Sequence, residues 1–472
     1  MSLRDHANSK QAKRFALVAV LGLIEFPVWS QSMTFDDAWA RVKAGSDQLA
    51  AAQAAVDSKS LQSTALQGLG GPVVSLSGAA YVYHASLDLS LDPVNQKLSQ
   101  ISQQLPLPLL NTLSQLNLPQ LPASYTLDRQ ATGSTQSVAA MWPIYMGGVS
   151  HSVRGFAAAQ GSEAQADADK SGHELATLLV QRYFGAQLAV KAATLRQTAF
   201  KDMAQHDAAT AKMLAAGVIS RVERLQAQAA LEEARRSAQR AQDDAELTGV
   251  ALARTVKADA PVQPQTPLFV MSAPTEPLAY FLSQALQHHP GLAKVSAKIE
   301  QAEQLHLGQE ALRKPQVFAF GQRELKTGSA NWVAGVGVRW TLFDSVNRDA
   351  LAAASNKQIE QAEHTQAQAR DDISLLVEKN WRSVEQTRQQ FLATATGIEL
   401  AQEVLRLRTA ALRQGTGTAL ELMDAEVNQA KVHTERAQLA YEYVMALARL
   451  LESCGLSDEF GRYVRQADLK VY

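Results

Sequence analysis

The feature that most constrains the fold of this chain is a short segment of alternating apolar residues followed directly by a very long helical segment. From residue 332 to residue 343, apolar side chains occupy every second position, the pattern of a strand with one apolar face. From Ser345 to Leu412 the sequence contains no proline and is rich in alanine and glutamine. A helix of about 65 residues would be about 100 Å long. Because no ordinary globular core is that long, this helix is expected to pack lengthwise against other helices.

The same pairing occurs twice in the chain. An offset of 198 residues aligns Trp142 with Trp340, Tyr183 with Trp381, and Gly217 with Gly415. Upstream, an offset of 243 residues aligns Leu49 with Leu292, and Pro72 with Pro315. Constant offsets across helix, strand and turn indicate a duplicated unit. The difference between the two offsets indicates an insertion in the first copy.

The duplication predicts the organisation of the whole chain. The first copy, 31–256, is expected to hold strands at about 72–84 and 129–145, an inserted loop at about 84–128, and long helices at about 148–216 and 221–256. The second copy, 277–454, is expected to hold strands at about 315–325 and 332–343 and long helices at about 346–412 and 418–453. Each copy should open with a helical segment, 35–66 unbroken and 278–312 broken near Pro290. A proline-rich linker, 257–276, separates the copies, and the tail 455–472 has no clear pattern.

The first thirty residues have the pattern of a secretory signal peptide. Basic residues precede an apolar run from Phe15 to Ile24, and Val28 and Ser30 supply small residues for a cut before Gln31. An uncleaved amphipathic N-terminus is the alternative. The single cysteine, Cys454, lies far from this cut and allows neither a lipid anchor there nor an intrachain disulfide.

The predicted strands have one apolar and one polar face. Trp142, Trp332 and Trp340 lie on the apolar face and suit the aromatic girdle of a membrane interface. Four strands cannot close a barrel, and open sheet edges are not tolerated in lipid. Several copies of the chain are therefore expected to close one barrel, with eight strands from a dimer or twelve from a trimer.

Two strand ends, W-P-I-Y at 142–145 and W-T-L-F at 340–343, and the turn G-T-G-T-A-L-E-L-M-D-A-E at 415–426 resemble the TolC-like outer-membrane efflux proteins. The resemblance implies a mainly α-helical homotrimer with a twelve-stranded barrel in the outer membrane of a Gram-negative bacterium. A long periplasmic α-helical tunnel would continue the barrel. The partners would be a periplasmic adaptor protein and an inner-membrane pump or ABC exporter, in a tripartite efflux or type I secretion system. Such proteins are passive ducts and not enzymes.

The resemblance also places an aperture at the periplasmic end of the tunnel. In the pattern G-T-x-x-x-x-D-x-L-D-A, the two aspartate positions correspond to Glu421 and Asp424. Three copies would turn each into a ring of carboxylates, which favours cations. Solvated surface acids are the alternative. Gly417 stands where a basic residue helps to hold the aperture closed, so Arg221 or Arg224, beside Glu223 in the first copy, is a candidate substitute.

The helix-reversing turns are expected at Gly217, Gly415 and Gly417, since glycine adopts positive φ at little cost. In the resembling family these turns are the tips that an adaptor protein docks against. A purely structural turn is the alternative.

The insertion, 84–128, contains thirteen leucines and only four charged residues. Its place between two strands predicts that it lies at the outer end of the barrel. It is either a folded external loop or a cap that narrows the outer mouth.

Other functions find little support. The nearly balanced formal charge of −1 gives no reason to expect a nucleic-acid partner. His288 and His289 have no further ligands at metal-binding spacing, so neither a metal nor another cofactor is predicted. The main alternative function is a periplasmic coiled-coil adaptor or structural protein without a pore. The apolar strand faces that carry tryptophan argue against it.

Overall fold

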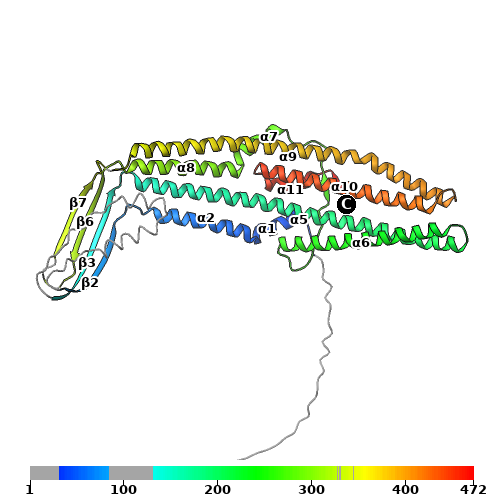
Figure 1. Ribbon diagram of the computed structural model, residues 1–472, viewed down its shortest axis with the longest axis horizontal. Coiled ribbons are helices and arrows are strands. Elements are labelled where there is room, and N and C mark those ends of the chain that lie inside the picture. Colours follow the sequence, from blue (N-terminus) through cyan, green and yellow to red (C-terminus); the bar gives the residue numbers. More distant parts are fainter. Residues whose placement is uncertain (1–30, 84–130, 327, 329–330, 344, 472) are drawn as a thin grey trace, which may run out of the picture.

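The computed structural model describes residues 31–83, 131–326, 328, 331–343 and 345–471. The expected signal peptide and the insertion lie outside these residues. A four-stranded sheet stands at one end, and long helices run side by side away from it (Figure 1). The fold predicted from the sequence, mainly helical with a small strand region, is confirmed in this part of the chain.

Six elements occur in the same order twice. The first set is α1 (Phe35–Gly45), α2 (Asp47–Leu66), β2 (Val73–Tyr83), β3 (Ala131–Tyr145), α5 (Val149–Ala215) and α6 (Arg221–Thr255). The second set is α7 (Leu278–His288), α8 (Pro290–Ala311), β6 (Gln316–Glu324), β7 (Trp332–Arg339), α9 (Arg348–Arg413) and α10 (Ala419–Ser453). Strand β7 therefore ends four residues before the predicted boundary at 343.

The segment 35–66, expected to be one helix, is two helices. Ser46 ends α1, and its hydroxyl then accepts a hydrogen bond from the Leu49 N–H at 3.3 Å to cap α2. At the equivalent position in the second copy, the Nδ1 atom of His289 accepts from the Gly291 N–H at 3.0 Å. Serine favours such caps because its oxygen satisfies an otherwise unpaired N–H. The break thus occurs in both copies, with proline marking only the second.

The linker and the tail, for which no regular structure was predicted, form short elements. In the linker, β4 (Val262–Pro264) pairs in parallel with β1 (Gln31–Met33). The other linker strand, β5 (Leu268–Val270), pairs antiparallel with β8 (Leu469–Val471) in the tail. The tail also contains η1 (Ser457–Glu459) and α11 (Phe460–Gln466). Strands of three residues carry too little periodicity to be recognised in a sequence.

The main hydrophobic core lies midway along the helices, where the linker and tail wrap them. Both long helices contribute buried side chains to this core, which are Leu175, Leu179, Tyr183, Ala186, Ile373, Val377, Val384 and Phe391. The Tyr183 hydroxyl donates to the Met33 carbonyl at 2.7 Å and accepts from the Thr266 N–H at 2.9 Å. At the equivalent position, the Trp381 Nε1 donates to the Glu276 carbonyl at 3.0 Å. Both aromatic side chains therefore attach the linker to a long helix.

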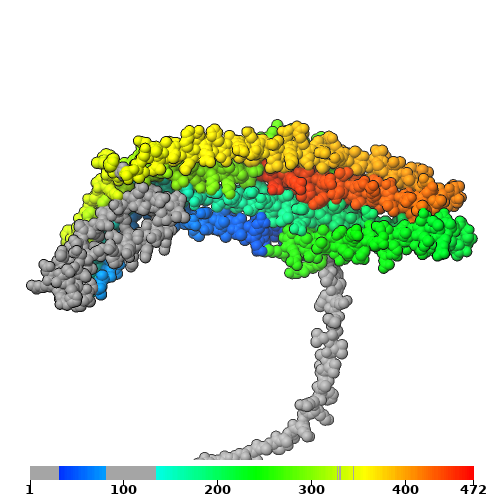
Figure 2. Space-filling view, in the orientation of Figure 1, coloured from blue at the N-terminus to red at the C-terminus, as the bar shows by residue number. Residues whose placement is uncertain are grey.

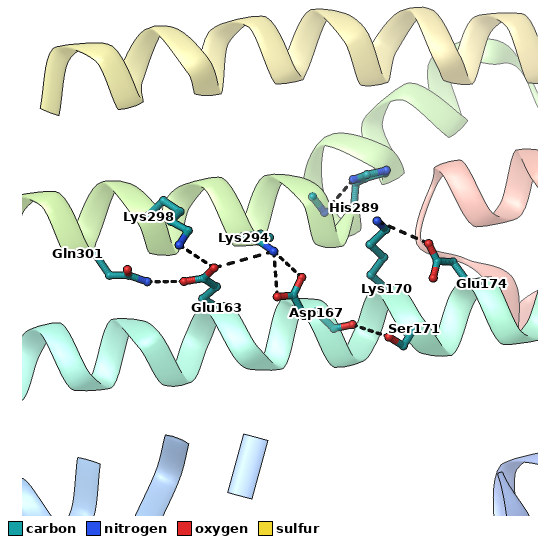
Figure 3. A network of polar contacts seen from close by, with 10 residues as sticks. Glu163, Asp167, Lys170, Ser171, Glu174, His289, Lys294, Lys298 and Gln301 are labelled. Atoms are coloured by element: carbon teal, nitrogen blue, oxygen red, sulfur yellow. Dashed lines mark hydrogen bonds and ion pairs between the residues drawn. The ribbon is translucent and has the colours of Figure 1, made fainter. Parts of the chain in front are cut away.

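Between the core and the sheet, polar contacts join α5 to α8 (Figure 3). The Glu163 carboxylate accepts from Lys298 and from the Gln301 amide, both at 2.8 Å. Lys294 contacts Asp167 at 2.8 Å. The hydrogen bonds from Gln301 and Lys298 outweigh burial and lower the pKa of the Glu163 carboxyl. Polar contacts of this kind set the register of two helices whose facing residues are mostly small.

Candidate functional site

The sheet presents two open edges. Its order is β2-β3-β6-β7, and every neighbouring pair is antiparallel. Among the residues that the structure describes, β2 and β7 therefore each have one side without a partner strand. An unpaired edge exposes backbone N–H and C=O groups that another strand can satisfy.

The strand register separates the sheet into two faces. Paired residues on neighbouring strands share a face of the sheet. Trp142 pairs with Ala319, and Trp332 pairs with Arg323, four residues further along β6. Trp142 and Trp332 therefore lie on the same face. Trp332 is 74% exposed, and Trp142 and Trp340 are 49% and 59% exposed. Eight residues separate Trp332 from Trp340, which is about 26 Å along an extended strand. This length is of the same order as the apolar band of a membrane sheet, about 25 Å.

Aromatic rings cover glycines on the opposite face. Phe318 lies opposite Gly337 and Phe320 opposite Gly335 on the neighbouring strand. A Cβ atom added at Gly337 would lie 2.4 Å from the Phe318 ring. A side chain at Gly337 would therefore require the Phe318 ring to move.

At the far end, each pair of long helices reverses in a tight turn, and the two hairpins end side by side (Figure 2). Gly217 has φ 69° and Gly415 has φ 72°, as predicted. Gly417 was expected to share this conformation, but its φ is not positive. A Cβ atom there would lie 2.9 Å from the Cβ of Ala411, so close approach of the chain explains this glycine.

Both return helices begin with a capping box. The Glu223 N–H donates to the Ser220 hydroxyl, and the Glu223 carboxylate accepts from the Ser220 N–H at 2.6 Å. That backbone hydrogen bond is the main reason why the pKa of Glu223 is lowered. Glu421 makes the same reciprocal contacts with Thr418. The sequence signal is Ser or Thr followed three residues later by Glu, and it was missed in both turns.

The aperture candidates make different contacts within the chain. Besides capping α10, Glu421 forms an ion pair with Arg408 of α9 at 3.0 Å and stays 43% exposed. Asp424 is exposed on the next turn of α10, and in the part of the chain that the structure describes it has no ion pair. Arg221 is exposed, whereas both terminal nitrogens of Arg224 contact the Asp207 carboxylate within the first hairpin. No contact between either arginine and Glu421 or Asp424 forms within these described hairpins.

A further contact near the tip was not found from the sequence. His206 of α5 and Glu426 of α10 lie 2.8 Å apart, measured from Nε2 to Oε1. The residues are separated by 220 positions in the chain. Neither follows a recognisable motif, so only the packing of α5 against α10 reveals the pair.

In the half of the molecule that lies away from the sheet, the long helices lie side by side in the order α6, α5, α10, α9 (Figure 1). The outer two helices carry exposed apolar residues at helical spacing. On α6 these are Val222, Leu225, Leu247 and Val250, and on α9 they are Leu375, Leu392, Leu400 and Leu407. The helix layer thus ends in two apolar edges, just as the sheet ends in two unpaired strands.

In the part of the chain that the structure describes, no helix combines the length and the hydropathy that a membrane-spanning helix needs. The described residues also contain no group of three or more histidine, cysteine, aspartate or glutamate side chains placed to hold a metal ion.

Comparison with known proteins identifies the fold. Residues 281–456 match the model of the outer membrane efflux protein family. A comparison with curated protein sequences gives no match. Among solved structures, the outer-membrane channel OprN superposes over 89% of this chain and 89% of its own, with TM-score 0.69 and 15% identity. The Campylobacter jejuni CmeC outer membrane channel covers 92% of this chain and 88% of its own, with TM-score 0.68 and 12% identity.

The Neisseria gonorrhoeae MtrE outer membrane channel, determined in its open state, covers 89% of this chain and 88% of its own, with TM-score 0.68 and 16% identity. These likenesses establish the fold over both copies, and the matching domain lies in the second. The chain therefore has the fold of these outer-membrane channels, and its residues 281–456 match the outer membrane efflux protein family.

Proposed function

We propose that three copies of the chain form an outer-membrane channel that conducts substrates passively out of the periplasm. The observation that carries this proposal is that the sheet and the helix layer each end in two exposed edges. The sheet has free edges at β2 and β7, and the helix layer has apolar edges at α6 and α9. Because the two edges of one copy differ, one edge of a copy can join the other edge of the next copy. Such head-to-tail contacts form a closed ring when the rotation between neighbouring copies adds up to a full turn.

Ring closure accounts for features that a single copy leaves unexplained. In the ring, β7 of one copy pairs with β2 of the next, so three copies give a twelve-stranded barrel without edges. The exposed apolar residues of α9 pack against those of α6 in the neighbouring copy. The tryptophan-bearing face then meets lipid, and the face with Phe318 and Phe320 lines the pore.

A channel of this kind needs partners on the inner side. We propose that the turns at Gly217, Gly415 and Gly417 dock against a periplasmic adaptor, which connects the channel to an inner-membrane pump or ABC exporter. The exposed Val218 at the first turn, 71% accessible, supplies an apolar contact for such a partner. The system is a tripartite efflux pump or a type I secretion system.

The channel proposal is tested with the full-length protein purified from membranes. We expect an oligomer that survives mild detergent, dissociates on heating, has three subunits by light scattering, and conducts ions in planar bilayers. A periplasmic adaptor or structural protein would instead leave the membrane fraction in high salt and produce no conductance. That result would contradict the proposal.

We further propose that Glu421 and Asp424 form two carboxylate rings at the inner aperture. They lie three residues apart on α10, so in a trimer both rings face the same narrow end. The capping contacts of Glu421 hold its carboxylate at the helix start. Carboxylate rings attract cations and repel anions.

The aperture is tested with the double substitution Glu421→Gln and Asp424→Asn. Glutamine preserves the capping box, so the change removes charge and keeps the turn. We expect the ratio of cation to anion permeability in bilayers to fall by about fivefold. The matched control is Asp371→Asn with Asp372→Asn, which removes two exposed charges far from the tip. If both double variants keep the wild-type ratio, the carboxylates do not line the aperture.

A further inference from the structure

The contact between His206 and Glu426 joins the two helical hairpins close to the tip. Helix α5, which carries His206, belongs to the first hairpin, and α10, which carries Glu426, belongs to the second. The two side chains are only 18% and 15% exposed. Within the described stretches 200–215 and 419–432, this is the only hydrogen bond between α5 and α10.

Little else holds α10 to α5 at this level. Near the contact lies a small apolar cluster of Met203 from α5, Ala227 from α6 and Met423 from α10, each at most 3% exposed. The large core is confined to the middle of the molecule. Because the apolar cluster is small, the polar contact is a substantial part of what joins the hairpins here.

The joint is close to the proposed aperture. Glu426 follows Asp424 by two residues and Glu421 by five on the same helix, which is about 3 Å and 7.5 Å along the axis. A movement of α10 away from α5 at Glu426 therefore carries both aperture carboxylates with it.

The charges around His206 make the joint sensitive to protons. Glu426 faces His206 from α10, and Asp202 lies one helical turn earlier on α5. On the α6 side, Arg224 is engaged by Asp207. The hydrogen bond with Glu426 raises the pKa of the His206 imidazole above its ordinary value, against the effect of burial. Burial and then the charge of Glu426 raise the pKa of the Asp202 carboxyl.

Both shifts act in the same direction. A group whose pKa is raised in the joined state stabilises that state below its ordinary pKa, and the stabilisation is lost as the pH rises through the raised value. At acidic pH the imidazolium pairs with the Glu426 carboxylate. At alkaline pH the imidazole is neutral and no longer offsets the repulsion between the Asp202 and Glu426 carboxylates. The second oxygen of Glu426 is also buried without a hydrogen-bond donor.

We propose that His206 and Glu426 form a proton-operated latch, which holds α10 against α5 in acid and releases it as the pH rises. The latch rests on the proposed channel function, and it adds a regulatory role that the family match does not supply. By the offset of 198 residues, Val404 and Gln228 stand at the equivalent positions. Neither α6 nor α9 therefore has a titratable side chain at the position equivalent to this contact.

The latch is tested by planar-bilayer recording of the full-length protein while the pH on the tip side is raised from about 5.5 to about 8.5, the range around histidine titration. We expect the open probability to rise by about fivefold or more, a factor that corresponds to about 1 kcal/mol. His206→Gln removes the titration and should flatten the profile. Glu426→Gln should leave the channel more open in acid. The control is His364→Gln on α9, which should keep the wild-type profile.

A second measurement separates the latch from the channel. Amide hydrogen exchange of residues 419–432, corrected for the intrinsic effect of pH, should rise with pH in the wild type and stay constant in His206→Gln. If no variant conducts but the exchange depends on His206, the channel proposal fails, and only the pH-dependent contact between α10 and α5 is supported. If His206→Gln keeps the wild-type pH dependence in both measurements, the latch is refuted.

Discussion

Replacing Ala140 by arginine is expected to prevent stable assembly of the protein in the membrane. Ala140 is exposed in β3, on the face that carries Trp142, and it lies between Val74 and Gly321 of the adjacent strands. An arginine on the lipid face costs from about 0–1 kcal/mol near the interfaces to about 2–4 kcal/mol at the middle of the bilayer, and the proposed ring repeats that cost in three copies. Loss of the heat-sensitive oligomer from the membrane fraction, measured by gel mobility, is the expected result.

The neighbouring residue provides the matched control. Ala139 lies between Ser75 and Gln322, on the opposite face of the same strand. Ala139→Arg would place its charge in the water-filled interior of the proposed barrel. The oligomer should therefore assemble, and only its conductance should change. Equal assembly of the two variants would show that the tryptophan-bearing face does not meet lipid.

Replacing Phe184 by alanine is expected to lower the thermal midpoint of unfolding strongly. The Phe184 ring is fully buried, with its centroid 5.5 Å from that of Phe35, 5.7 Å from Phe269 and 5.9 Å from Phe460. These partners belong to α1, the linker and the tail, so one ring joins three segments to α5. Truncating a buried phenylalanine costs about 3–5 kcal/mol, which we expect to detect by circular dichroism during heating.

The duplication supplies the control for this variant. Arg382 stands at the position equivalent to Phe184, and its side chain is 71% exposed and paired with Glu378 of the same helix. Exposed ion pairs contribute little to stability. Arg382→Ala should therefore leave the midpoint nearly unchanged. A similar fall in both variants would mean that the aromatic cluster does not anchor the linker and tail.

The contrast between Phe184 and Arg382 shows where the internal repeat stops being informative. The offset of 198 residues predicts the helices and turns of both copies, because helix period and glycine turns are local properties. The linker and tail contribute Phe269 and Phe460 to the surroundings of Phe184, whereas Arg382 is exposed. Residues at equivalent positions therefore meet different surroundings, and repeat alignment cannot predict which of them is buried.

At the inner tip, the sequence predicted the turns at Gly217 and Gly415 because positive φ is costly for every residue but glycine. For Gly417 the same reasoning gave the wrong cause. Its glycine is needed because a Cβ atom added there would lie 2.9 Å from the Cβ of Ala411, and this approach depends on how the two helices meet. The ion pair of Glu421 with Arg408 is likewise a contact between helices.

By itself, the sequence determined the duplicated order of elements, the apolar face of the strands and the length of the helices. Each of these follows from periodicity within a single element. Only the tertiary structure decided which side chains meet across elements, such as His206 with Glu426, 220 residues apart. A helical period specifies which face a residue occupies, but the partner depends on the neighbouring helix and on its axial register. That register is set by the packing of the whole chain, including the linker and tail whose short strands leave no periodic signal.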